Sequence, residues 1–247
     1  MEKRARLNRI FGIALLAAAL VVMGWQLALI YISGMRHVLH GLLLILAVCG
    51  PLALGTHLLA RSFSAEADRR RVVRTALFVL FGFYCATLVG ALIVSRVDAL
   101  HFAESRADYW DNFDLMTNFR PFETVRLYLN AIRYDYIGME IPLSNLVGNA
   151  MLFMPMAVFL PCLFRPMRRF WLFALTMALV LVAVEALQLL LACGSCDVDD
   201  VLLNLTGTLI VFGVLKLPPV KRLLVRTRLM PEDAKADEAA PPTATAE

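Results

Sequence analysis

The sequence predicts an all-α membrane protein, a polytopic bundle of about six transmembrane helices with one extracytoplasmic amphipathic helix. Of its 247 residues, 60% are hydrophobic, whereas a soluble domain is usually about 45–50% apolar. Several apolar stretches also approach or exceed the roughly 20 residues that a helix needs to cross a bilayer. The formal net charge of +4 is small, so the positions of the basic residues are more informative than their sum.

The first expected span follows a basic start and is too long for the apolar core of a typical signal peptide. We therefore interpret it as an uncleaved signal anchor. Polar residues inside the later spans are expected to face the bundle interior. The expected spans lie near residues 11–32, 38–60, 72–95, 146–164, 170–193 and 201–217.

Lysine and arginine gather in four groups, and six spans would place all four on one side of the membrane. Loops rich in these residues stay in the cytoplasm, so both termini are expected there. The groups are Lys3, Arg4, Arg6 and Arg9; Arg61, Arg69, Arg70, Arg71 and Arg74; Arg165, Arg168 and Arg169; and Lys216, Lys221, Arg222, Arg226 and Arg228.

The long segment 96–145 would then lie on the opposite side. Within it, the stretch NFRPFETVRLYLNAI, residues 118–132, repeats apolar residues at helical spacing, which predicts an amphipathic helix. Pro121 suits its first turn. The helix is expected either on the outer membrane surface or packed over the bundle, and both remain open. The repeated residues are Phe122, Val125, Leu129 and Ile132.

Cys193 and Cys196 form a single C-x-x-C pair in a short loop. A second pair with zinc spacing is absent from the sequence, which argues against a structural zinc site. In an oxidising compartment the pair could form a disulfide, and two idle thiols are the equal alternative.

Two asparagines mark the outer end of the fourth span. Asn145 and Asn149 are four residues apart and would share a helix face. Ser144 or Asn145 could instead be the N-cap of this helix. Pro155 and Pro161 are expected to kink the helix or to free carbonyl groups within the membrane.

Glu185 and Gln188 share one face of the fifth span, with Glu185 roughly 12 Å from its outer end. A carboxylate at that depth is costly and should face the bundle or a wet cavity. A functional role is favoured over a simple polar contact with Asn149 or Asn204, because acids are rare in spans.

The stretch DVDDVLLNLTGTLIVFG, residues 197–213, places three acids directly before the last span. Asp200 and Asn204 are four residues apart and would share a helix face. Asp199 or Asp200 is expected to cap the helix. Gly207 and Gly213 are expected to let another helix approach closely.

By this topology, polar groups from the last three spans meet at one depth near the outer side, which predicts a site. Its predicted ligand-binding residues are Asn145, Asn149, Glu185, Gln188, Asp200 and Asn204. If the site is catalytic, the candidates are Glu185, Asp199 and Asp200. No cofactor is predicted, and Asp197, Asp199 and Asp200 are only weak candidates for holding a metal ion.

Four stretches occur in the order typical of the VanZ-like family, which the chain resembles over about residues 75–215. They are NFRPFETVRLYL, NLVGNAMLFMPMAVFLP, EALQ and DVDDVLLNLTGTLIVFG. The family patterns that they resemble are N-P-F-x-T/I, N-x-x-G-N-x-x-x-F-x-P-x-G, E-x-x-Q and D-x-D-D-x-x-x-N-x-x-G. The matching residues are Asn145, Gly148, Asn149, Phe153 and Pro155; Glu185 and Gln188; and Asp197, Asp199, Asp200, Asn204 and Gly207.

Two positions depart from the family pattern. Ala157 stands where a glycine is usual. Gly194 stands where relatives often carry an arginine, three residues before the first aspartate of the last motif. That arginine would be an ion-pair partner for Glu185 or Asp200. The substitutes expected for it are Arg120 and Arg126.

The chain is expected to have three parts. Residues 1–74 would form an N-terminal transmembrane helix pair with a cytoplasmic basic loop, and residues 75–217 the VanZ-like transmembrane domain. Residues 218–247 would be a cytoplasmic tail, first basic and then disordered. The resemblance implies a multi-pass protein of the bacterial cytoplasmic membrane.

The family takes its name from a protein linked to low-level teicoplanin resistance, so the resemblance implies a role in the bacterial cell envelope. The function ranked first is a non-enzymatic protein that binds a lipid-linked or lipidated molecule at the outer leaflet and lowers susceptibility to teicoplanin-type glycopeptides. Second is a membrane-embedded enzyme acting on an envelope lipid or peptidoglycan precursor, with Glu185 as general base. Third is a small transporter or scaffold subunit with Glu185 as a proton-relay acid. The expected partner is a membrane lipid or lipid-linked precursor and not a nucleic acid, and the oligomeric state stays open.

Overall fold

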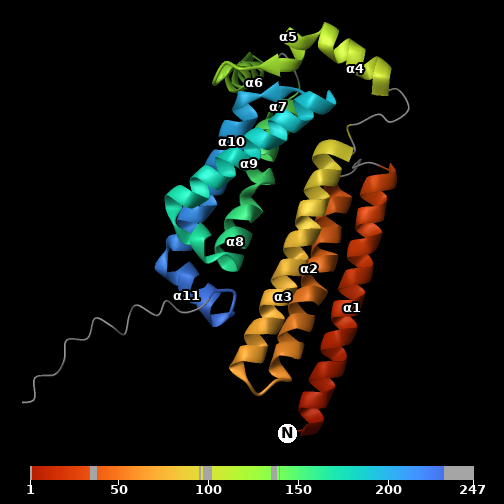
Figure 1. Cartoon of the computed structure of the whole chain (residues 1–247), viewed down its shortest axis with the longest axis vertical. Coiled ribbons are helices and arrows are strands. Elements are labelled where there is room, and N and C mark those ends of the chain that lie inside the picture. The colour runs from red at the N-terminus through yellow and green to blue at the C-terminus, as the bar shows by residue number, and fades with distance from the viewer. Residues whose placement is uncertain are drawn as a thin grey trace, which may run out of the picture.

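The structure, a computed structural model, describes residues 2–33, 38–94, 96, 102–134, 138 and 140–230. Long helices lie side by side and form nearly all of the described backbone (Figure 1), which confirms the all-α membrane fold class. Within the described residues, five segments are long and apolar enough to cross a membrane: Glu2–Ala28, Glu66–Val94, Ile141–Leu163, Phe170–Leu191 and Val198–Lys216. The remaining expected span, 38–60, coincides with helix α2, Val38–Arg61.

The first three helices form one group in Figure 1. They are α1 (Glu2–Ser33), α2 and α3 (Glu66–Val89), and α3 continues as a short π-helix, η1 (Gly90–Val94). A Cβ atom on Gly12 of α1 would lie 3.0 Å from the carbonyl oxygen of Gly55 in α2. These two glycines therefore let the backbones approach closely, a contact that the apolar pattern of the sequence did not indicate.

The second group contains the later spans. It consists of α7 (Glu140–Leu152), α8 (Met154–Leu163), the 3₁₀-helix η2 (Arg165–Arg168), α9 (Phe170–Leu191), α10 (Val198–Lys216) and α11 (Pro218–Arg226). The basic part of the expected tail thus begins as the helix α11, while the expected disordered part, residues 231–247, lies outside the described residues.

The fourth span is broken at Phe153 into α7 and α8, two residues before Pro155, which confirms the expected kink. The hydroxyl of Tyr84 donates a 2.6 Å hydrogen bond to the carbonyl of Leu152 at the break. Because α7 begins at Glu140, Asn145 lies inside the helix, and the alternative that Asn145 is its N-cap is wrong.

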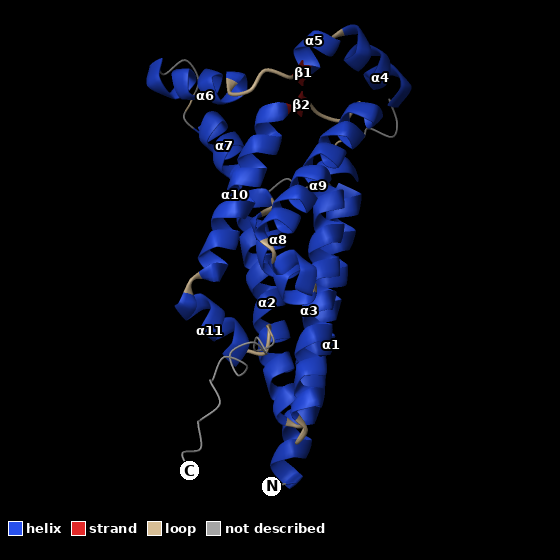
Figure 2. Ribbon diagram, turned by 60° about the vertical axis from the view of Figure 1, so that its left-hand side comes forward, coloured by secondary structure: helices blue, strands red, loops and turns tan. Residues whose placement is uncertain are grey.

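Short elements cover the end of the second group that lies opposite α11 (Figure 2). They are α4 (Phe102–Asp111), α5 (Phe113–Met116), β1 (Thr117–Asn118), α6 (Glu123–Tyr134) and β2 (Cys196–Asp197). The strands β1 and β2 pair in parallel, with Asn118 opposite Asp197. The expected amphipathic helix is α6, which buries Ala131 and leaves Leu129 exposed.

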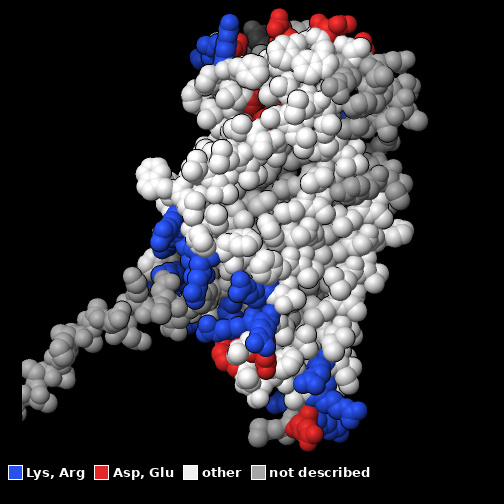
Figure 3. Space-filling view, viewed as in Figure 1, with Lys and Arg blue, Asp and Glu red and all other residues white. Residues whose placement is uncertain are grey.

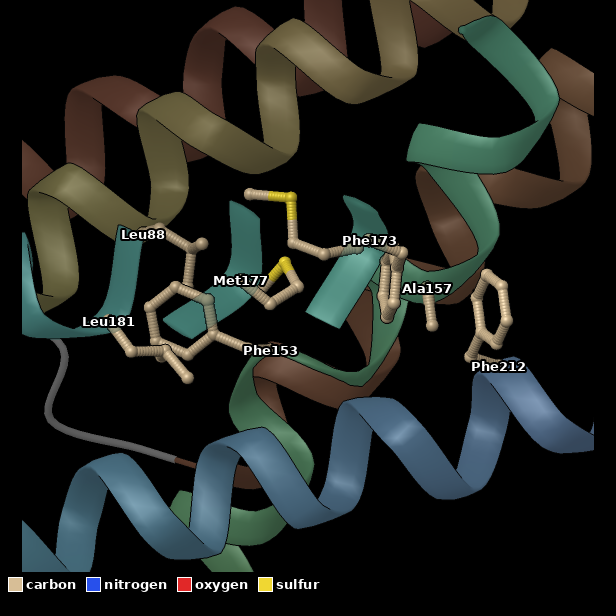
Figure 4. Packing of buried hydrophobic residues seen from close by; sticks show 8 residues of the cluster. Leu88, Phe153, Ala157, Phe173, Met177, Leu181 and Phe212 are labelled. Carbon is tan, nitrogen blue, oxygen red and sulfur yellow. The ribbon is translucent and has the colours of Figure 1, made fainter. Parts of the chain in front are cut away.

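The core of the second group lies where α8, α9 and α10 meet α3 (Figure 4). The rings of Phe173 and Phe212 stack with centroids 4.5 Å apart. Ala157, which stands where a glycine is usual in the family, is fully buried in this cluster.

Charged side chains are confined largely to the two ends of the molecule. Figure 3 shows Lys and Arg gathered toward the lower end, with a broad surface almost free of charge above them. The N-terminus, the α2–α3 turn and α11 all lie toward that end in Figure 1. This end is called the basic end below, and the end covered by α4–α6 is called the capped end.

The two glycines of α10 differ in their surroundings. A Cβ atom on Gly207 would collide with the carbonyl oxygen of Ala150 in α7, which confirms the close approach expected there. A Cβ atom on Gly213 would meet no atom within 4 Å, so the same expectation for Gly213 is wrong.

These surroundings predict opposite effects of the same substitution. Gly207→Ala should destabilise the fold by about 1–3 kcal/mol, because α7 and α10 must separate to admit the methyl group. Gly213→Ala, the matched control, should be neutral or slightly stabilising, since alanine has the higher helix propensity. Thermal unfolding of both variants in detergent tests this, and equal unfolding temperatures would contradict the contact.

Candidate functional site

The first acid of the C-terminal stretch caps α10. Asp197 precedes the helix with extended backbone, and its Oδ1 accepts a 2.8 Å hydrogen bond from the backbone N–H of Asp199. This is the geometry of an N-cap, which satisfies one of the unpaired N–H groups of a first turn. The expectation that Asp199 or Asp200 caps this helix is therefore wrong.

Asp199 instead holds the start of a different helix. Its side chain is fully buried, and its two oxygens accept backbone N–H groups from Phe122, at 2.5 Å, and Val125, at 3.0 Å. These N–H groups belong to the beginning of α6, where helical partners are missing. Phe122 has a φ of 66°, an uncommon conformation for a residue other than glycine, and the bond to Asp199 holds it there.

Asp197 completes the attachment through side chains. Its Oδ1 accepts the amide of Asn118 at 3.0 Å, and its Oδ2 accepts the hydroxyl of Thr124 at 2.5 Å. We call Asp197 and Asp199 the acid clamp, because together they fasten the segment 118–125 to the first turn of α10. The sequence did not indicate this role for either residue.

Four of the six predicted ligand-binding residues meet beneath the clamp. The side-chain amide of Asn149 in α7 donates to Oδ1 of Asp200 in α10. Oε2 of Glu185 in α9 accepts the backbone N–H of Asp197 at 3.1 Å. Asn204 donates to the backbone carbonyl of Asp200 at 2.8 Å. The last three spans therefore converge at one level, in the arrangement that the topology predicted.

The other two predicted residues are directed elsewhere. Gln188 is buried and donates to the carbonyl of Leu92 at 3.1 Å, which ties α9 to the π-helix η1. Asn145 is exposed and donates to the carbonyl of Ile141 within its own helix, at 3.0 Å. Neither bond reaches Asn149 or Asp200, so these two residues lie at the edge of the cluster.

Two buried polar atoms near this level have no hydrogen-bond partner within the described residues. They are Oδ1 of Asn204 and the hydroxyl of Tyr109, whose side chains are 5% and 6% exposed. A buried polar atom without a partner costs free energy. One is an acceptor and the other can donate, so the pair offers hydrogen bonds of both kinds to a ligand.

Arg96 supplies the positive charge of this region. Its guanidinium Nη1 lies 2.7 Å from the position that a Cβ atom on Gly194 would occupy, and the guanidinium interacts electrostatically with Glu185 and Asp200. Gly194 also has a φ of 120°, which favours glycine. Arg96 therefore brings a positive charge close to the position at which relatives often carry the arginine.

The substitutes expected for that arginine point elsewhere. Arg120 is 85% exposed and pairs with Glu123 at 3.8 Å on the surface, and Arg126 is likewise exposed. Arg96 was missed because it follows the end of the third span, about one hundred residues from the motif that needs its charge.

Two tyrosines of the capped end also border the site. Burial, and then the nearby Cys196, Cys193 and Glu185, raise the pKa of Tyr109 above its ordinary value. Burial, followed by the carboxylates of Asp200 and Asp197, raises the pKa of Tyr128 in α6. Both phenols therefore remain protonated at neutral pH and can donate hydrogen bonds.

The acids show no arrangement suited to a metal ion. Within the described residues, no group of three or more His, Cys, Asp and Glu side chains is placed to hold one. The oxygens of Asp197 and Asp199 already accept hydrogen bonds from the chain itself. Cys193 and Cys196 are both buried free thiols.

Comparison with known protein families identifies a match over the later spans. Residues 81–218, more than half of the chain, match the family model described as VanZ/LLP1. No curated protein and no solved structure matches the chain.

The acid clamp predicts a specific effect of losing Asp199. Asp199→Ala leaves two backbone N–H groups without an acceptor, which costs about 1–3 kcal/mol for each group. The segment 118–125 should then detach, and chymotrypsin should cleave after Phe122 at least about tenfold faster than in the unchanged protein, since a loss of that size raises the detached population accordingly. Asp111→Ala is the control, because Asp111 is an exposed acid of the same capped end. Unchanged cleavage in Asp199→Ala would contradict the clamp.

The cysteines of the β2 loop should react slowly with alkylating agents. Burial raises the pKa of both thiols. The charge of Arg96 partly lowers the pKa of Cys193, whereas the carboxylate of Glu185 raises the pKa of Cys196 further. A raised pKa lowers the fraction of thiolate, the reactive form, at neutral pH. Iodoacetamide labelling followed by peptide mass spectrometry should therefore give rates that keep rising above pH 9. A rate that levels off near pH 8 in the folded protein would contradict this.

Proposed function

The chain belongs to the VanZ/LLP1 family, and we propose that it binds a lipid-linked or lipidated molecule of the bacterial cell envelope at the outer leaflet and thereby lowers susceptibility to teicoplanin-type glycopeptides. The observation that carries the binding site is the meeting of Asn149, Glu185 and Asp200 from three different spans beneath α6. Polar and ionisable residues inside a membrane bundle are costly and mark functional sites by default.

The proposal places the capped end outside the cell. Its support is the gathering of Lys and Arg at the opposite end (Figure 3), because basic loops remain in the cytoplasm. The site then lies at the depth of the outer headgroups, which a lipid-linked molecule can reach from the side of the bundle.

The chemistry of the site favours a ligand that mainly donates hydrogen bonds. Glu185, Asp200 and the unpartnered Oδ1 of Asn204 are acceptors. Arg96 and the hydroxyl of Tyr109 offer a smaller number of donors. Hydroxyl, amide and ammonium groups of an envelope headgroup match this set, and its acyl chain would lie among the apolar side chains that α6 leaves exposed, such as Leu129.

The alternative of a metal-dependent enzyme has less support. It needs carboxylate oxygens available for a hard cation, whereas those of the acid clamp accept hydrogen bonds that hold α6. A binding role requires only the convergence of polar groups, which is why we place it first.

Teicoplanin susceptibility of a sensitive bacterium tests the proposal. Expression of the unchanged chain should raise the teicoplanin concentration needed to stop growth. Glu185→Ala and Asn204→Ala should abolish this protection, since each removes a buried group worth about 1–3 kcal/mol of ligand binding. Asn145→Ala is the matched control, because its side chain bonds only to its own helix among the contacts described above.

Immunoblots of the membrane fraction must show equal amounts of all variants. Protection that persists in both Glu185→Ala and Asn204→Ala would sink the site assignment. An unchanged chain that gives no protection at all would sink the link to teicoplanin and leave lipid binding to be judged separately.

Lipid binding has its own measurement. Protein purified in native membrane should carry a lipid-linked molecule that mass spectrometry identifies, and the double variant Asp200→Ala/Asn204→Ala should lose it, because both acceptors of α10 are then missing. Retention of the same molecule by the folded double variant would contradict binding at this site.

A further inference from the structure

Two adjacent cavities lie between the helices toward the basic end, and the larger extends from Arg228 to Met151 of α7. The larger, of about 890 Å³, lies between α2, α3 and α8 and is lined mainly by aliphatic side chains such as Leu52, Leu80 and Val158. We call it the apolar cavity. The smaller, of about 520 Å³, lies between α3 and η2, and we call it the arginine basin. Residues that border both are Val73, Leu77, Arg228 and Leu229.

Arginine side chains from three parts of the chain line the arginine basin. Arg228 donates to both oxygens of Glu66, at 2.7 and 3.1 Å, and Arg70 lies 3.4 Å from the same carboxylate. Within the part of the chain that the structure describes, five arginines line the basin and Glu66 is the acid paired with them, so positive charge predominates there. The arginines are Arg70, Arg74, Arg165, Arg168 and Arg228.

Backbone carbonyl groups help to hold two of these guanidinium groups in place. Arg74 donates to the carbonyl of Leu163 at 3.5 Å, and Arg168 donates through Nε to the carbonyl of Pro161 at 3.0 Å. Both carbonyls belong to the last turn of α8, where helical partners are missing. The two side chains are therefore positioned together at the mouth of the basin.

We propose that one anionic phospholipid of the membrane leaflet at the basic end occupies both cavities. Its phosphate binds in the arginine basin, where a charged oxygen can accept from several guanidinium groups at once. Its acyl chain lies in the apolar cavity, between the α1–α3 group and the α7–α11 group. Basic pockets between transmembrane helices on the cytoplasmic side are suited to such headgroups.

Charge and shape together select a lipid over a free anion. An inorganic phosphate would neutralise the basin but leave the aliphatic walls of the apolar cavity exposed to water, which is unfavourable. A neutral phospholipid would fill the apolar cavity but bring no net negative charge to the arginines that line the basin. An anionic phospholipid satisfies both cavities, whose sizes lie within the range of ligand pockets of about 300–1,000 Å³.

Native mass spectrometry of the full chain in detergent, with added lipids of matched acyl chains, tests this proposal. Phosphatidylglycerol should bind at least about tenfold more tightly than phosphatidylcholine, and should raise the unfolding temperature more. Arg74→Gln/Arg165→Gln should reduce phosphatidylglycerol binding by about tenfold or more. Ala76→Phe, which fills the apolar cavity, should weaken the binding of both lipids.

The matched control is Arg71→Gln/Arg222→Gln, which removes the same charge from exposed positions outside both cavities. It should bind phosphatidylglycerol as the unchanged chain does. Equal binding of the two lipids, equal loss in the control, or displacement of the lipid by inorganic phosphate would each overturn the proposal. If Arg74→Gln/Arg165→Gln fails to fold, two measurements still test the proposal. They are the comparison of the two lipids on the unchanged chain and the binding of both lipids to Ala76→Phe. If the unchanged chain carries no lipid-linked ligand but still binds phosphatidylglycerol, only the proposed function is contradicted.

Discussion

The first turn of α10 is the point on which the arrangement of the capped end depends. A carboxylate that is fully removed from water must be met by several donors, and Asp199 finds them in backbone N–H groups at the start of α6. Asp197 caps its own helix and binds Asn118 and Thr124 with the same carboxylate. Two helix N-termini, each with unpaired donors and a partial positive charge, thus share one pair of acids. Once this turn is fixed, Asp200 faces Asn149 and the N–H of Asp197 faces Glu185.

The sequence predicted the spans well because the signal for a span is local and strong. Length and apolar content decide whether a helix can cross a membrane, and Pro155 marks the break in the fourth span without any tertiary information. The convergence of Asn149, Glu185 and Asp200 could also be predicted, because alternating span directions place them at the same end. The roles of Asp197 and Asp199 could not, since their partners lie more than seventy residues away in the segment 118–125. Gly213 shows the same limit, because a small residue permits a close approach only where a neighbour exists.

Arg96 shows how a motif can lose a residue and keep its charge. The bare backbone at Gly194 leaves room for the guanidinium of Arg96, which a side chain at that position would displace. Gln188 bonds to Leu92 in the π-helix that precedes Arg96, so α9 is tied to the segment that leads to this charge. Helical segments of this type often lie at functional sites. The departure at Gly194 is therefore better described as a relocation of the positive charge than as its loss.

The break at Phe153 divides the fourth span between the two ends of the molecule. Above it, α7 carries Asn149 to the polar site; below it, α8 lines the apolar cavity with Val158 and Phe159. A proline removes a helical hydrogen bond in the preceding turn, and Tyr84 of α3 donates to the carbonyl of Leu152 at this place. The same tyrosine packs its ring against Phe159, with centroids 5.5 Å apart. One side chain of α3 thus contacts the chain on both sides of the break, Leu152 at the end of α7 and Phe159 within α8, and so ties both halves of the span to α3.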